Sequence, residues 1–228
     1  MRLQWISRLA AVSLVVLASG FLTAFTQPVT LDARWERSFP AGFSLVNVNT
    51  PSGNIAVEAW DRPEIGVRAT LRASGASVAE AQHLLDSIRI EFGTDGSILR
   101  GDVPEPRPVP GGVGVDFTVR VPRDLAVDVR TGRGTIAVTG VAAPLSVTSG
   151  DGNLSVANAP GPMTLETSNG SVAVTLPPGA GAQLDLTTAN GQISVQGVAA
   201  GLNRVQTGIG AGGPGITVRT SSGSIAVN

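Results

Sequence analysis

Residues 141–228 contain three carboxylates that could support catalysis: Asp151, Glu166 and Asp185. Hydrolysis of a glycosidic bond needs two carboxyl groups roughly 5–10 Å apart. Glu166 and Asp185 fall at comparable positions of successive repeat units, so stacking of the units would bring them to about 5 Å, the usual strand spacing. No histidine, lysine or tyrosine accompanies them. Glu166 and Asp185 are therefore weak candidate surface positions for a polysaccharide-acting enzyme.

Composition excludes several other kinds of site. The 228 residues include no cysteine, no lysine and a single histidine, His83, which falls on the polar side of a predicted helix and is expected to be solvated. Disulfides, thiolate zinc sites and multi-histidine metal centres are therefore excluded. The net charge of −1 suggests binding neither to nucleic acid nor to an acidic membrane surface. We expect no catalytic residues, no cofactor, no metal and no nucleic-acid partner.

The elements that would position the carboxylates are copies of a twelve-residue unit, clearest at residues 163–174. Two short stretches of alternating apolar and polar residues flank a polar turn that ends in glycine, which is typical of strand, turn, strand. Further copies lie at 127–138, 145–156, 184–195 and 216–227, with an isolated early copy at 46–57. The structural turn glycines of these units are Gly53, Gly134, Gly152, Gly170, Gly191 and Gly223.

The spacing of these glycines predicts how the units assemble. After the early copy the intervals are 18, 18, 21 and 32 residues, and a period near twenty with two strands per unit is typical of a β-solenoid. Met163, Leu165, Val172 and Val174 would then point inward and form the core. Each glycine would supply a positive φ or allow coils to approach closely. We expect a mainly β fold, with a β-solenoid or β-helix-like stack over residues 122–228.

Residues 31–121 predict a β-rich N-terminal segment that caps the stack and contains one short helix at 77–88. Ser77 and Glu80 form a capping box at the start of this helix, and its apolar residues recur on one face. Four prolines at alternate positions within residues 103–112 predict an irregular connection and exclude a central strand.

Residues 1–25 have the features of a signal peptide or membrane anchor. Arg2 and Arg8 accompany a ten-residue apolar stretch, and small residues suited to cleavage follow it. Without cleavage, residues 9–25 are at the short end of what can span a bilayer. In both cases the remainder is expected outside the cytoplasm, in the periplasm or at the cell surface, with residues 9–25 as the anchor in the second case.

The turn gives the unit a specific form, Thr-Ser-x-Gly between alternating apolar residues, at 167–170 and 220–223. This form resembles the repeat of the bacterial "putative adhesin" β-strand-repeat family, which is largely a domain of unknown function. The order of elements over roughly residues 45–228 is similar as well. The resemblance implies an envelope-exposed repeat protein, and some relatives accompany membrane-stress systems. It implies no site residues.

These observations favour a non-enzymatic, exported, adhesin-like repeat protein of the cell envelope that binds or scaffolds. Its partner would be an envelope protein or a glycan. The alternatives are a polysaccharide-acting β-solenoid enzyme and an accessory protein of an envelope-stress system. The polar residues expected to point outward on the stack are Thr164, Glu166, Asp185, Thr187, Thr217 and Arg219.

Two more specialised functions find little support. Calcium binding lacks the Gly-Gly-x-Gly-x-Asp repeat that would supply it. An ice-binding face needs paired threonine columns, whereas the sequence offers one, formed by Thr148, Thr167, Thr187 and Thr220. The strand that ends at residue 228 is expected to leave an open sheet edge, which would be an assembly surface or would be covered by the N-terminal segment.

Overall fold

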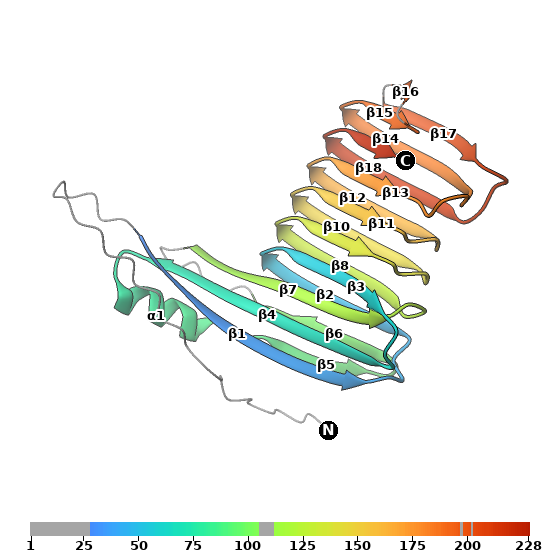
Figure 1. Cartoon of the computed structure of the whole chain (residues 1–228). Coiled ribbons are helices and arrows are strands. Elements are labelled where there is room, and N and C mark those ends of the chain that lie inside the picture. The colour runs from blue at the N-terminus through green and yellow to red at the C-terminus, as the bar shows by residue number, and fades with distance from the viewer. Residues whose placement is uncertain (1–27, 105–111, 197, 202) are drawn as a thin grey trace.

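The computed structural model describes residues 28–104, 112–196, 198–201 and 203–228, so the predicted signal segment and most of the proline-rich connection lie outside the described residues. Two sheets face each other along a stack of coils (Figure 1). The ten-stranded sheet has the spatial order β1 (Val29–Pro40), β4 (Glu64–Gly75), β7 (Gly112–Pro122), β3 (Ile55–Trp60), β9 (Ile136–Thr139), β11 (Leu154–Ala157), β13 (Val172–Thr175), β19 (Ile225–Val227), β15 (Ile193–Val195) and β16 (Val198–Gly201).

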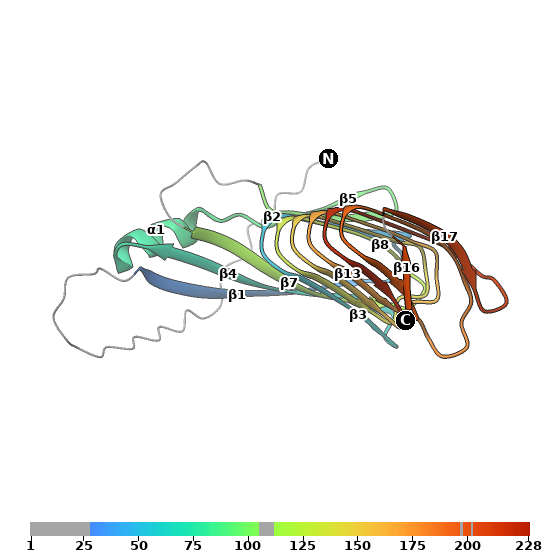
Figure 2. The same cartoon turned by 90° about the horizontal axis from the view of Figure 1, so that it is seen from above.

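The second sheet has nine strands among the described residues. Each repeat unit places its first strand here and its second strand in the ten-stranded sheet, so one unit makes one coil, and the coils nest when viewed from above (Figure 2). The spatial order is β17 (Arg204–Ile209), β14 (Ala182–Asn190), β18 (Gly215–Ser222), β12 (Met163–Asn169), β10 (Leu145–Asp151), β8 (Ala126–Arg133), β2 (Leu45–Ser52), β6 (Ile98–Asp102) and β5 (Glu91–Asp95).

The core lies between the two sheets and follows from the alternation along each strand. Side chains of a strand point to opposite faces in turn, and Met163, Leu165, Val172 and Val174 are all buried, as predicted. Parallel pairing in constant register places equivalent residues of neighbouring coils side by side. The prediction of a mainly β, solenoid-like stack with one short helix near the N-terminus is confirmed.

The turn glycines form a column at the corner where the chain passes from one sheet to the other. Five of them have φ between +135° and +156°, and Gly191 lies outside this range. At all six, a Cβ atom would overlap a backbone carbonyl group of the adjacent coil. Close approach between coils is therefore the demand that they share. In stacking order the column runs Gly53, Gly134, Gly152, Gly170, Gly223 and Gly191.

A second column, of buried hydroxyl groups, lies beside the glycines. In five coils this hydroxyl donates a hydrogen bond of 2.9–3.1 Å to the carbonyl oxygen of the turn glycine in the preceding coil of the stack, as Thr167 Oγ1 does to Gly152. These bonds satisfy carbonyl groups that the corner turns toward the interior. The members of this hydroxyl ladder are Thr50, Thr131, Ser149, Thr167, Thr220 and Thr188.

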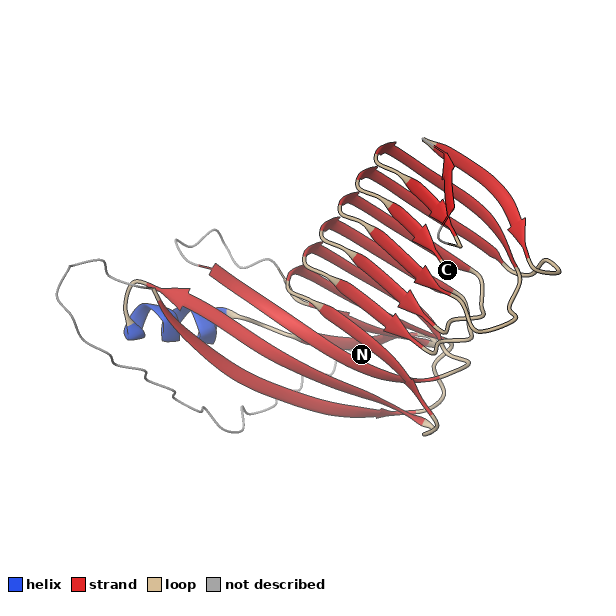
Figure 3. Cartoon of the chain, turned by 45° about the horizontal axis from the view of Figure 1, so that its top comes forward, coloured by secondary structure: helices blue, strands red, loops and turns tan. Residues whose placement is uncertain are grey.

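The order of coils in space differs from their order in the sequence. The coil of residues 215–227 lies between the coil of 163–175 and the coil of 182–195, because β18 pairs with both β12 and β14. The last strand of the chain was expected to leave an open sheet edge. This expectation is wrong, because that strand, β19, is an interior strand that pairs with β13 and β15. Antiparallel strands β16 and β17 form this end of the stack instead (Figure 3).

The early unit at 46–57 is not isolated in space. Its strands β2 and β3 pair in parallel with β8 and β9, so it stacks directly on the first of the later coils. Beyond it, β1 and β4 continue the ten-stranded sheet with antiparallel pairing. They extend past the nine-stranded sheet, where helix α1 (Val78–Ser87) covers them (Figure 1).

The predicted capping residues Ser77 and Glu80 both form hydrogen bonds at the start of α1. Ser77 Oγ accepts a hydrogen bond from the Glu80 backbone N–H, and the Glu80 carboxylate accepts one from the Ala76 N–H, one residue earlier than in the usual capping box. Leu84 and Leu85 are buried against the sheet and His83 is exposed. Phe92 of β5 lies between the two sheets against two rings of β1. Its ring centroid is 5.3 Å from that of Trp35 and 5.1 Å from that of Phe39.

Candidate binding surface

Glu166 and Asp185 do not form the pair of adjacent carboxylates that the sequence suggested. The inserted β18 separates their strands, so their backbones lie about 10 Å apart at a strand spacing of ~4.8 Å. They also occupy different rows: Glu166 is level with Arg219, whereas Asp185 is level with Thr217. The expectation of a separation near 5 Å is wrong.

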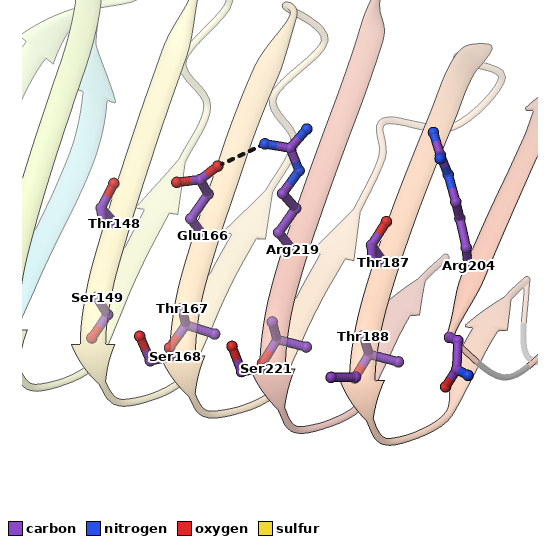
Figure 4. Close-up of a pocket in the computed structure, with 13 residues that line it drawn as sticks. Thr148, Ser149, Glu166, Thr167, Ser168, Thr187, Thr188, Arg204, Arg219 and Ser221 are labelled. Atoms are coloured by element: carbon purple, nitrogen blue, oxygen red, sulfur yellow. Dashed lines mark hydrogen bonds and ion pairs between the residues drawn. The ribbon is translucent and has the colours of Figure 1, made fainter.

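Both carboxylates nevertheless border one surface, which we call the polar face. It is the outward side of the nine-stranded sheet over β10, β12, β18, β14 and β17 (Figure 4). A shallow hollow of about 740 Å³ lies over it. The hollow is lined by Thr148, Ser149, Glu166, Thr167, Ser168, Thr187, Thr188, Ala189, Asn203, Arg204, Arg219, Thr220 and Ser221.

Ion pairs between neighbouring strands hold the charged side chains of the polar face. Glu166 Oε1 lies 3.3 Å from Arg219 Nη1, the contact drawn as a dashed line in Figure 4. Asp185 accepts two hydrogen bonds from Arg204, at 3.2 Å from Nε and 3.0 Å from Nη2, a bidentate geometry. Each arginine thus fixes one carboxylate and leaves part of its guanidinium exposed.

The hydrogen bonds from Arg204 lower the pKa of Asp185 below its ordinary value, although desolvation opposes this shift. The amide of Gln206 and the nearby charges of Arg204 and Arg219 act in the same direction as the bonds. A general acid at neutral pH needs a raised pKa. The environment of Asp185 therefore suits a permanently charged group that binds rather than a group that donates a proton.

Hydroxyl groups make up most of the rest of the polar face. Thr148, Glu166, Arg219 and Thr187 form one row across four parallel strands, level with Arg204 of β17. The row offers donors and acceptors at intervals of ~4.8 Å. The six polar residues expected to point outward are partly or fully exposed, and the residues before and after each of them are buried. They are Thr164, Glu166, Asp185, Thr187, Thr217 and Arg219.

The threonine column considered for ice binding does not exist. Thr148 and Thr187 lie in the outward row, whereas Thr167 and Thr220 point inward and belong to the hydroxyl ladder. Sequence reasoning missed this ladder, although its signal is present: a serine or threonine stands three residues before every turn glycine. It also missed Arg204 as the partner of Asp185, because the antiparallel return of β17 has no marker in the repeat.

The described residues contain no group of three or more His, Asp or Glu side chains arranged to hold a metal ion. The predicted turn glycines all lie at the corner column and not on the polar face. No helix within the described ranges is both long and apolar enough to cross a membrane. The polar face is thus a surface of fixed ion pairs and hydroxyls.

Comparison with known proteins agrees with this architecture. Residues 123–228 match the family model described as Toastrack DUF4097. Among solved structures, a "putative cell adhesion protein" from Clostridium sporogenes ATCC 15579 matches with a TM-score of 0.63 at 12% identity, covering 88% of this chain and 99% of that one. At this identity the likeness shows the fold alone.

A "putative adhesin" from Bacteroides fragilis NCTC 9343 is 11% identical over 86% of this chain and 97% of its own, with a TM-score of 0.31. Comparison with curated proteins gives no significant match. The likeness to the Clostridium sporogenes structure agrees with the stack of short strands described above. Residues 123–228 are thus similar to the Toastrack DUF4097 family model, and the chain shares its fold with the bacterial protein described as a "putative cell adhesion protein".

Proposed function

We propose that this protein is a non-enzymatic, exported binding module of the cell envelope and that the polar face is its binding surface. The observation that carries the proposal is the row of hydroxyls and ion-paired side chains over β10, β12, β18, β14 and β17. A solenoid holds such a row on a rigid backbone, so a ligand can be bound through many modest contacts without ordering the surface first.

The ion pairs support binding over catalysis. Glycoside hydrolysis needs one carboxyl group with a raised pKa and a second one at a defined distance. Glu166 and Asp185 are instead each paired with an arginine and lie in different rows. A ligand that carries both donors and acceptors, such as a hydroxyl-rich glycan, fits this alternation of guanidinium, carboxylate and hydroxyl groups.

Export rests on the sequence of residues 1–25, whose charge and apolar stretch suit a signal peptide or an anchor. A fusion of this segment to a reporter enzyme that is active only outside the cytoplasm tests it. Activity of the fusion, lost on deletion of residues 9–25, supports export. Equal activity with and without those residues would remove it.

Binding is tested with the mature chain from about residue 26, immobilised and challenged in parallel with a set of envelope glycans and with an extract of envelope proteins. Arg219→Ala and Arg204→Ala change the polar face, and Arg68→Ala is the matched control. Arg68 lies on the outward face of the other sheet and has a similar partner, Glu36 at 3.2 Å, and similar exposure, 51% against 63% for Arg219.

We expect one glycan class to be retained by the unchanged chain and by Arg68→Ala, with retention at least tenfold weaker for the two polar-face variants. Retention of an envelope protein in place of a glycan, with the same dependence on the polar face, would favour the scaffold or envelope-stress alternative. Equal retention by all three variants would exclude the polar face as the binding surface. Cleavage of a retained glycan that is abolished by Glu166→Gln would refute the non-enzymatic assignment.

A further inference from the structure

The coil of residues 215–227, here called the inserted coil, fills a slot between two coils that precede it in the sequence. Its strand β18 pairs in parallel with β12 on one side and β14 on the other, and β19 pairs likewise with β13 and β15. Its apolar side chains are buried to 99% or more, namely Ile216, Val218, Ile225 and Val227. The slot is thus complementary to this segment on both of its edges.

The connection that joins β17 to the inserted coil is short, and its backbone conformation requires glycine. Residues 210–214, here called the hinge, lead from β17 over the start of β14 to β18. Gly210 and Gly212 have φ of +62° and +86°, values that favour glycine. A Cβ atom at Gly213 would overlap the carbonyl group of Gly181. The closed path of the hinge therefore depends on its glycines.

We propose that the inserted coil is exchangeable between two copies of the chain, so that the coil of each copy fills the slot of the other. Every contact of the coil with β12, β13, β14 and β15 would be reproduced in the exchanged dimer, because the slot and the coil are the same in both copies. Only the hinge would differ. The balance between the two forms is therefore set by concentration and by the conformational free energy of the closed hinge.

The geometry allows this exchange. Five hinge residues span at most about 18 Å when extended, and β17, from which the hinge departs, is the edge strand of its sheet. Two copies that meet at this edge would bring each hinge within reach of the other slot. The product is a two-fold symmetric dimer in which both polar faces belong to one particle. This inference does not rest on the proposed function, since exchange needs no ligand.

The first test strains the closed hinge. In a Gly213→Val variant the added side chain overlaps Gly181 only when the hinge is closed. We therefore expect the mass of this variant in solution to shift from monomer toward dimer as its concentration rises. Gly93→Val is the matched control, because Gly93 has no atom within 4 Å of an added Cβ and no positive φ. A folded Gly213→Val variant that stays monomeric at every concentration would overturn the proposal.

The second test uses the chain with its hinge unchanged and exploits the lack of native cysteine. Thr164 and Thr217 are partners in the β12–β18 register, at a strand spacing compatible with a disulfide. Chains that carry only Thr164→Cys and chains that carry only Thr217→Cys are mixed, unfolded, refolded together and oxidised. Exchange places one thiol of each kind side by side, so a mixed disulfide dimer should form in a yield that rises with concentration.

The control for random collisions pairs Thr164→Cys with Ser155→Cys, which lies on the outward side of β11 in the other sheet. A yield several-fold above this control supports the exchange. A yield equal to the control overturns it, and this comparison remains decisive if Gly213→Val does not fold. Loss of glycan retention in the preceding experiments would leave both outcomes unaffected, so the two proposals fail separately.

Discussion

Thr167→Val tests whether the hydroxyl ladder holds the coils together. Valine has nearly the shape of threonine but cannot donate the 3.0 Å hydrogen bond from Thr167 Oγ1 to the carbonyl oxygen of Gly152. The site is only 5% exposed, so water cannot easily replace the lost donor. A buried acceptor left without its partner costs about 1–3 kcal/mol. We expect Thr167→Val to lower the free energy of unfolding by about 2 kcal/mol.

Two companions isolate the hydroxyl from other effects of the substitution. Thr167→Ser keeps the donor and loses one methyl group, a change that costs about 0.5–1.5 kcal/mol in a core; Ser149 already occupies the equivalent position of the preceding coil. Thr164→Val makes the same chemical change on the exposed side of the same strand. We expect it to stay within about 0.5 kcal/mol of the unchanged chain.

The measurement is thermal unfolding of the three variants, with chemical denaturation as a second probe. For a domain of this size, 2 kcal/mol corresponds to a fall in Tm of about 4–8 °C. The order of stability should be Thr164→Val, then Thr167→Ser, then Thr167→Val. A Thr167→Val variant that melts no lower than Thr164→Val would refute a stabilising role of the hydroxyl ladder.

Three further predictions concern the corner, the ion pairs and the helix. Gly170→Val should destabilise the fold by more than about 1 kcal/mol, because its Cβ would overlap a carbonyl group of the adjacent coil at a φ of +156°; an unchanged melting point would contradict this. The carboxylate of Asp185 has a lowered pKa, so its pairing with Arg204 stabilises the folded state above a pH of about 4 and is lost as the pH falls through the folded-state pKa. Asp185→Asn should therefore lower the Tm at pH 7 and converge with the unchanged chain in acid, and a constant difference across this pH range would count against the pair. Ser77→Ala removes the N-cap of α1 and should cost about 1 kcal/mol in chemical denaturation, whereas a loss below about 0.3 kcal/mol would show that packing alone holds the helix.

The coil itself could be predicted because its signals are local. Alternation with a period of two decides which residues of 163–174 face the core, and the glycine marks the corner whatever lies beside it. The order of the coils could not be predicted in this way. Every coil presents Val, Ile or Leu inward and a glycine at the corner, so the coil of 215–227 would fit several slots.

The rows of the two carboxylates could have been predicted from the sequence by counting positions back from the turn glycine of each unit. Measured back from the turn glycine of its own unit, Glu166 stands four residues before Gly170 and Asp185 six before Gly191. Side chains that differ by two positions share a face but not a row. Counting from the glycine also puts Arg219 four residues before Gly223, level with Glu166, as the register confirms.

The common register of the coils also sets how the length of this protein can change in evolution. Residues 127, 145 and 163 are direct partners, so adjacent units repeat every 18 residues with the same glycine and the same hydroxyl at the corner. A duplicated unit would offer its neighbours the carbonyl and the hydroxyl that they already meet. Insertions and deletions of whole units preserve the column, whereas a shift of one residue turns the core outward and a shift of two moves the glycine away from the corner. Such a chain lengthens in steps of one coil, and each step extends the outward surface by one strand.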